Sequence, residues 1–433
     1  MAIEQRGPSR YTSAIIVVTS IFFIWGFITC LNDILIPHLR AVFSLNYTQV
    51  MLIQFTFFGA YFIMSMPAGK VLGLIGYKNS ISAGLLVAGI GALMFYPAAA
   101  FESYGLFLSA LFVLASGITM LQVAANPYIS LLGDEQTASS RLNLAQAFNS
   151  LGTTIAPAFG GLLILSNSVL APEQQAQLSA EALGAYRLQE AQAVQIPYVG
   201  LAVVLALLAV MIYLWRLPSF KEQAGEPGQG EHSFAAVLRH RHVVFAIIGL
   251  FLYVGAEVSI GSFMINYLSL PEIGGISESQ AAHYLSLYWG GAMVGRFVGA
   301  ALMRVVRDYL LLGLFALVAG SLVLISIIAS GQVSMWSIIA VGLFNSIMFP
   351  TLFTLGINRM GPLTGKASSL LIMAIVGGAI LPVLQGALAD NFSLQIAFLL
   401  PVLCYLYIAW YGFSGHRVRE TTADVGGQTN LGH

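Results

Sequence analysis

Long apolar runs alternate with short polar connections along most of the 433-residue chain. A helix needs about 20 apolar residues to cross the hydrocarbon core of a bilayer. Twelve runs reach that length, with approximate bounds 13–36, 48–74, 79–98, 104–129, 141–166, 194–215, 243–269, 280–303, 309–329, 333–357, 367–389 and 393–413. The pattern therefore predicts an all-α membrane protein with twelve transmembrane helices.

One connection differs from the others in length and composition. It covers 216–242, is rich in charged residues, proline and glycine, and separates six apolar runs from six. We therefore predict an N-terminal six-helix bundle at 1–215, a cytoplasmic linker at 216–242 and a C-terminal six-helix bundle at 243–413. A disordered cytoplasmic tail is predicted at 414–433. The outer connection 167–195 is rich in Ala, Gln and Glu and is a candidate for a short surface helix.

The two sets of six runs carry matching residues at a nearly constant offset. The pairs are Gly69-Lys70-x-x-Gly73 with Gly295-Arg296-x-x-Gly299 (226 residues), Gly152-x₄-Pro157-x₃-Gly161 with Gly377-x₄-Pro382-x₃-Gly386 (225), Pro127 with Pro350 (223) and Asp33 with Glu257 (224). Membrane carriers are often built from such internal repeats. The offset predicts two pseudo-symmetric six-helix bundles, with one buried acid in the first helix of each.

Composition excludes a soluble protein. Hydrophobic residues make up 58% of the chain and charged residues only 8%, against roughly 25% charged in an ordinary soluble domain. The formal net charge is zero, so nothing points to nucleic acid as a partner. We expect the lipid bilayer to be the main surroundings of the chain.

The distribution of basic residues predicts the orientation. With both termini inside, fifteen Lys and Arg residues fall on the cytoplasmic side, while only Arg40 and Arg187 fall outside and Arg296 lies within a run. Lys and Arg accumulate in cytoplasmic loops. The expected location is therefore the cell inner membrane. Cys30 and Cys404 both lie in apolar runs and suggest no disulfide framework.

Asp33 and Glu257 are the acids that stand inside apolar runs. Such residues are expensive in a membrane and are functional candidates by default. Burial favours the neutral form of an acid, so Asp33 can take up and release a proton near neutral pH. The alternative is that Asp33 ends a helix and reaches outer water. Glu257 is a second candidate for protonation or an acceptor for substrate hydroxyls; the alternative is a structural acid bonded to Ser259 or a neighbouring helix.

Amide and aromatic side chains gather in the same runs. The candidate substrate-binding residues are Gln122, Asn126, Asn143, Gln146, Asn149, Tyr253, Glu257, Asn266, Trp289, Asn345 and Gln385. Amides offer both a donor and an acceptor, which suits neutral polyhydroxylated ligands, and aromatic rings can stack on a sugar. The alternative for each amide is a hydrogen bond between helices.

Lys70 and Arg296 follow the repeated glycines near the predicted inner ends of their runs. Small residues permit close helix contact, and a cation there can meet a helix C-terminus or an acid. We interpret Lys70 and Arg296 as gating residues that hold the inner side shut.

Several strings resemble a known family. Leu31-Asn-Asp-Ile-Leu-Ile-Pro37, Ala124-Ala-Asn-Pro-Tyr128, Arg141-Leu-Asn-Leu-Ala-Gln-Ala-Phe-Asn-Ser150 and Tyr253-Val-Gly-Ala-Glu-Val-Ser259 are similar to motifs of the major facilitator superfamily. Within it they resemble the fucose permease and glucose/galactose transporter family of sugar–cation symporters.

The resemblance implies roles for individual residues. It makes Asp33 the principal coupling acid, with Asn32 beside it, and matches Asn149 to a sugar-contacting asparagine. Gln122 stands where the fucose type has a second acid, so that proton role does not transfer. Glu257 is an acid where the fucose type has an amide, as in the glucose/galactose-like branch.

The expected function is secondary active import of a neutral hexose of the glucose/galactose type, coupled to H⁺, with Na⁺ near Asp33 as the alternative ion. The alternatives are uptake of fucose or N-acetylglucosamine, a drug–proton antiporter, and a non-transporting sugar sensor. We expect no enzyme activity and no cofactor, because no metal-ligating cluster or activated nucleophile stands out. A monomer is expected to suffice.

Overall fold

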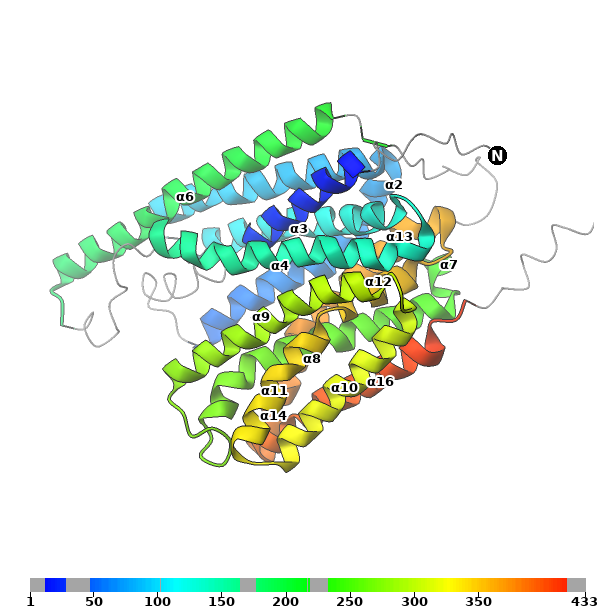
Figure 1. The fold of residues 1–433 in the computed structure, drawn as a ribbon. Coiled ribbons are helices and arrows are strands. Elements are labelled where there is room, and N and C mark those ends of the chain that lie inside the picture. Colours follow the sequence, from blue (N-terminus) through cyan, green and yellow to red (C-terminus); the bar gives the residue numbers. More distant parts are fainter. Residues whose placement is uncertain are drawn as a thin grey trace, which may run out of the picture.

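The structure is a computed structural model that describes residues 12–28, 47–101, 103–163, 177–215, 217–218 and 233–418. These residues are almost entirely helical (Figure 1). In the N-terminal part the helices are Thr12–Ile28, α2 (Tyr47–Ala100), α3 (Tyr104–Leu131), η1 (Glu135–Thr137), α4 (Ala138–Leu163) and α6 (Ala180–Leu214).

The C-terminal part continues the same pattern with shorter pieces. Its helices are α7 (Phe234–Leu238), α8 (Arg241–Ser269), α9 (Glu278–Leu302), α10 (Asp308–Ile328), α11 (Gly331–Asn345), α12 (Met348–Ile357), η2 (Gly361–Leu363), α13 (Thr364–Met373), η3 (Ala374–Val376), α14 (Gly377–Asn391), α15 (Leu394–Ala397), α16 (Leu399–Trp410) and a π-helical end, η4 (Tyr411–Gly415). Within the described residues, eight helical segments are long and apolar enough to cross a membrane.

Three helical segments differ from the predicted runs. α2 joins the second and third runs, and the break between them lies at Gly76, whose φ of 76° and ψ of 172° are outside the helical region. Glycine adopts such angles without steric cost. The run at 333–357 is divided into α11 and α12, and the run at 367–389 into α13, η3 and α14.

Two helix boundaries also differ slightly from the predicted ones. α6 starts at Ala180, after the cap Ser179, whose side chain accepts from the Ala182 N–H. From residue 180 the predicted surface helix in 167–195 is therefore the first part of α6, whose apolar span covers Gln195–Leu214. The last helical segment reaches Gly415, two residues into the predicted tail.

Figure 1 shows the helices from Thr12 to Leu214 on one side of the molecule and most of those from Phe234 onward on the other. α4 and α9 pack against each other along the seam between the two groups, and α13 packs against α2 and α3. Within the described residues, α2, α3 and α4 of the first group form the seam with α9, α12, α13, η3 and α14 of the second.

The repeated glycines explain how each group is packed. A Cβ atom at Gly152 would collide with the Phe23 carbonyl of the first helix, and one at Gly377 would collide with the Phe251 carbonyl of α8. Small residues let membrane helices approach until their backbones touch. Gly152 and Gly377 occupy equivalent crossings, which gives the repeat found in the sequence a physical cause.

Candidate functional site

Glu257 lies in the middle of α8, at the centre of a cluster of tyrosines. The Tyr253 hydroxyl, one turn earlier, donates to Oε1 of Glu257 over 2.7 Å. From α9, the Tyr288 hydroxyl approaches the Glu257 carbonyl at 3.5 Å. Tyr253 and Tyr288 are fully buried, whereas Glu257 keeps some exposed surface. Tyr253, and not Ser259, is thus the hydrogen-bond donor to this carboxylate.

Asn345, the last residue of α11, forms hydrogen bonds with three tyrosines. Its Nδ2 donates to the Tyr288 hydroxyl over 2.7 Å, and its Oδ1 accepts from the Tyr405 hydroxyl over 2.7 Å. Its backbone carbonyl lies 3.0 Å from the Tyr253 hydroxyl. Both ends of the Asn345 amide therefore have a protein partner in this structure, as the alternative of a bond between helices expects.

Arg296 on α9 connects the surroundings of Glu257 to the other half of the molecule. Its positive charge acts on the Glu257 carboxylate. Its Nε donates to the Ser346 carbonyl over 3.3 Å, and its Nη1 donates to the hydroxyl of Ser150 on α4. A hydrogen bond from α9 to α4 crosses the seam, so Arg296 makes the kind of contact expected of a gating residue.

Three of the predicted amides in the first half also have protein partners. Gln122 Nε2 donates to the Tyr61 hydroxyl over 2.6 Å. Asn149 Nδ2 donates to the Phe22 carbonyl over 2.9 Å, which ties α4 to the first helix. Asn143 Nδ2 donates to the Ser139 carbonyl over 3.0 Å. These bonds are of the interhelical or local kind that the sequence left as the alternative.

Other amide atoms are buried without a protein hydrogen-bond partner among the described residues. Among the predicted site residues they are both amide atoms of Asn126, both of Gln385, Oδ1 of Asn143 and Nε2 of Gln146. A buried polar atom without a partner calls for a water or a ligand. Asn126, Asn143 and Gln146 lie on the neighbouring helices α3 and α4, and Gln385 lies on α14. These four predicted residues therefore keep hydrogen-bonding capacity that no described protein group uses.

Asn266 and Trp289 take no part in the hydrogen bonds described above, and two other predicted residues cannot be placed. Asn266 is exposed near the end of α8, nine residues and so about 13 Å along the helix axis from Glu257. Trp289 is 44% exposed, and its ring lies edge-on to Tyr288 with centroids 5.0 Å apart. Asn32 and Asp33 lie outside the described residues.

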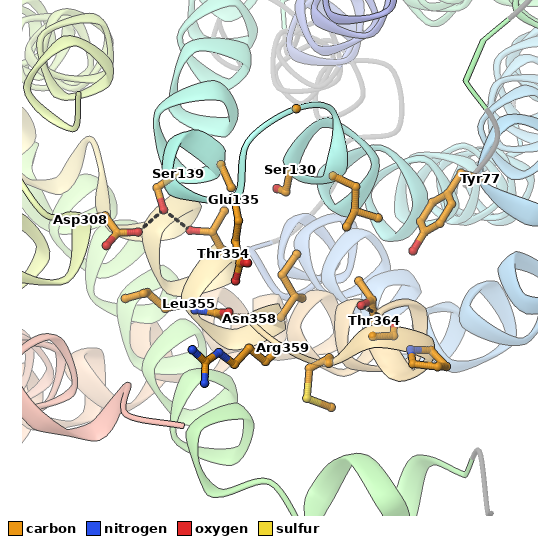
Figure 2. A pocket seen from close by; sticks show the side chains of 17 residues that line it. Tyr77, Ser130, Glu135, Ser139, Asp308, Thr354, Leu355, Asn358, Arg359 and Thr364 are labelled. Carbon is orange, nitrogen blue, oxygen red and sulfur yellow. Dashed lines mark hydrogen bonds between the residues drawn. The ribbon is translucent and has the colours of Figure 1, made fainter. Parts of the chain in front are cut away.

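The seam is closed at the end that the basic residues predict to be cytoplasmic. There the Ser139 hydroxyl of α4 lies 2.6 Å from Oδ2 of Asp308 and 2.6 Å from the Thr354 hydroxyl (Figure 2). We call these three residues the inner latch. They border a cavity of about 560 Å³ lined by residues of both halves. Sequence reasoning missed the latch, whose one visible signal is the acid Asp308 at the start of an apolar run.

A second set of contacts closes the same end between α13 and the first half. The Ser369 hydroxyl donates to the Ser65 carbonyl over 2.6 Å, and the Ser368 hydroxyl donates to the Val123 carbonyl over 2.8 Å. Gly69 lies directly against Ser369, where a Cβ atom would not fit. Lys70, by contrast, is exposed. On this side the glycine of the repeated motif makes the contact across the seam, while its lysine is exposed.

Comparison with known proteins agrees with this architecture. The family model of the Major Facilitator Superfamily matches residues 14–375. The chain therefore belongs to the major facilitator superfamily and is a multi-pass membrane protein, as the motifs predicted.

Two relatives are named as sugar transporters. A glucose/galactose transporter of Brucella abortus is 51% identical over 96% of this chain and 97% of its own length. The L-fucose-proton symporter of Escherichia coli is 37% identical over 97% of this chain and 96% of its own length. A solved structure of the transporter FucP in the outward conformation has a TM-score of 0.88 and 36% identity, covering 95% of this chain and 100% of that one.

Proposed function

We propose that this protein is a secondary active transporter that imports a neutral hexose of the glucose/galactose type together with a cation. H⁺ is the proposed cation, and Na⁺ is the alternative. The observation that carries the proposal is the carboxylate of Glu257 inside an apolar helix, where Tyr253 donates to it and the positive charge of Arg296, which bonds across the seam, acts on it. This arrangement stands in a chain that matches a glucose/galactose transporter over nearly its whole length.

The mechanism follows from the cost of burying charge. In this proposal twelve spans form two bundles, 1–215 and 243–413, which rock around a central site. An isolated carboxylate is costly in a closed, dry cavity, and protonation removes that cost. A sugar that binds the neutralised state better therefore moves together with its proton. Asp33, with Asn32 beside it, and Glu257 are the proposed coupling groups, and Na⁺ is the alternative ion.

The buried amides without protein partners, Asn126, Asn143, Gln146 and Gln385, are the proposed contacts for sugar hydroxyls. The closed inner end of the seam corresponds to a carrier whose central site opens outward. We place the protein in the inner membrane with both termini in the cytoplasm and expect it to function as a monomer. The linker at 216–242 would then lie on the cytoplasmic side.

The test is counterflow in liposomes containing the purified protein. Labelled glucose, galactose, fucose and N-acetylglucosamine are compared at fixed pH, with and without Na⁺. We expect glucose and galactose to exchange fastest and a pH gradient alone to drive their accumulation. Exchange of fucose alone would show that the substrate is fucose and not a hexose of the glucose/galactose type. Accumulation only with Na⁺ would overturn the assignment of H⁺ as the coupling ion.

A further inference from the structure

The Tyr253 hydroxyl has two acceptors and one hydrogen. Oε1 of Glu257 lies 2.7 Å away and the Asn345 carbonyl 3.0 Å away. A phenolic hydroxyl donates a single hydrogen bond, so it serves one acceptor at a time. Tyr253 is fully buried, which leaves these two as its choices among the described residues. The arrangement has two hydrogen-bonding states.

The carbonyl of Asn345 is available because the tenth span is broken there. α11 ends at Asn345 and α12 begins at Met348. The last carbonyls of a helix have no intrahelical donor, and Pro350 has no N–H to offer the Ser346 carbonyl. Ser346 O accepts from Arg296 Nε instead, over 3.3 Å. Two carbonyls at the break are thus held by Tyr253 and Arg296, and both of these side chains also act on Glu257.

We propose that Tyr253 and Arg296 are positioning residues that transmit the charge state of Glu257 to the break between α11 and α12. With Glu257 ionised, the Tyr253 O–H donates to the carboxylate. When Glu257 binds a proton, its new O–H donates to the Tyr253 oxygen and the Tyr253 O–H turns to the Asn345 carbonyl. One proton is gained at Glu257 and none is lost elsewhere. This inference rests on the proposed function only for its link to transport.

The groups facing Glu257 support this assignment. Tyr253 comes from its own helix, Arg296 and Tyr288 come from α9, and Tyr405 comes from α16. Among these described groups, Glu257 is the one carboxylic acid, so a proton bound in this cluster is bound at Glu257. Arg296 also donates to Ser150 across the seam, which gives the signal a route to the other half.

Asn345 fixes the receiving end of this relay. Its amide is held on one side by Tyr405 and on the other by Tyr288. A side chain held at both ends keeps the last turn of α11, and with it the Asn345 carbonyl, in one position. The movement that follows protonation then falls on residues 346–352, just beyond the held turn.

The test measures this segment without using a sugar. Hydrogen exchange of residues 346–352 is followed by mass spectrometry in the full-length protein across pH, relative to α10 in the same sample, which removes the intrinsic pH dependence of exchange. We expect protection of 346–352 to rise by about threefold or more as pH falls. Glu257→Gln and Tyr253→Phe should both abolish this transition.

Tyr267→Phe is the matched control. Tyr267 is a fully buried tyrosine of the same helix whose hydroxyl donates to the Ser326 carbonyl over 2.8 Å, and its removal should leave the transition in place. A transition that persists in Tyr253→Phe or Glu257→Gln, or that is missing from the unmodified protein, overturns the relay. Because no hexose is present, these outcomes are separate from a failure of hexose counterflow, which would contradict the proposed function alone.

Discussion

The two halves of this transporter use the same repeated glycines but different cations. Gly152 and Gly377 make equivalent backbone contacts, with Phe23 and with Phe251. The cations that follow the other repeated glycine have diverged, because Lys70 is exposed while Arg296 bonds across the seam. Backbone packing restricts a crossing glycine strongly, whereas a long side chain at the seam is free to acquire a new role in one half.

The crossing glycines should give the largest effects. Gly152→Val and Gly377→Val each force a side chain into a backbone carbonyl, which we expect to cost about 3 kcal/mol or more by overpacking. Thermal unfolding in detergent, followed by loss of a monodisperse peak, measures the effect. Gly59→Ala is the control, because a Cβ atom there meets nothing within 4 Å. Unequal losses at the two positions would break the equivalence of the halves.

Substitution of the two cations, Arg296 and Lys70, should give the next largest effect, and the effect should differ between them. Arg296→Gln removes charged hydrogen bonds to Ser346 and Ser150, each of which contributes about 1.5–3 kcal/mol. Because about 1.4 kcal/mol is a factor of ten, we expect pH-driven sugar uptake to fall by roughly 30-fold or more. Lys70→Gln should lower it by less than about twofold. Equal losses would mean that both cations act as gates, as the sequence predicted.

The inner latch should give a smaller shift. Ser139→Ala removes bonds to Asp308 and Thr354 and should weaken closure by about 1 kcal/mol. The inward-open population should therefore rise about fivefold, measured as labelling of a single cysteine placed on the inner seam. Ser369→Ala tests the contact of α13 with α2 at the same end, where one bond to the Ser65 carbonyl is lost. No change from either variant would show that the hydroxyls do not hold this end closed.

The parts of the fold that depend on local pattern could be predicted from the sequence. Long apolar runs and the spacing of Gly152 and Gly377 led to helical spans and a repeat, because membrane burial and close crossings select residue types directly. The break after Asn345 could not be predicted from Pro350, because proline also occurs inside runs that stay helical, as Pro127 does in α3.

The site was predictable in its residue types and less so in its contacts. Glu257 was found because a charge in an apolar run is rare. The pairing of Ser139 with Asp308 spans 169 residues, and serine is too common in membrane helices to signal it. Whether Asn345 meets a sugar or a tyrosine depends on which helices face it, and only tertiary packing decides that.

The most direct test of the central claim compares driven accumulation with exchange in the same liposomes. Labelled hexose is followed under a pH gradient and in counterflow, for the unmodified protein, Asp33→Asn and Glu257→Gln. We predict that Asp33→Asn loses accumulation while exchange survives and that Glu257→Gln binds sugar more weakly. Full accumulation by Asp33→Asn, together with unchanged affinity and coupling in Glu257→Gln, would contradict the account.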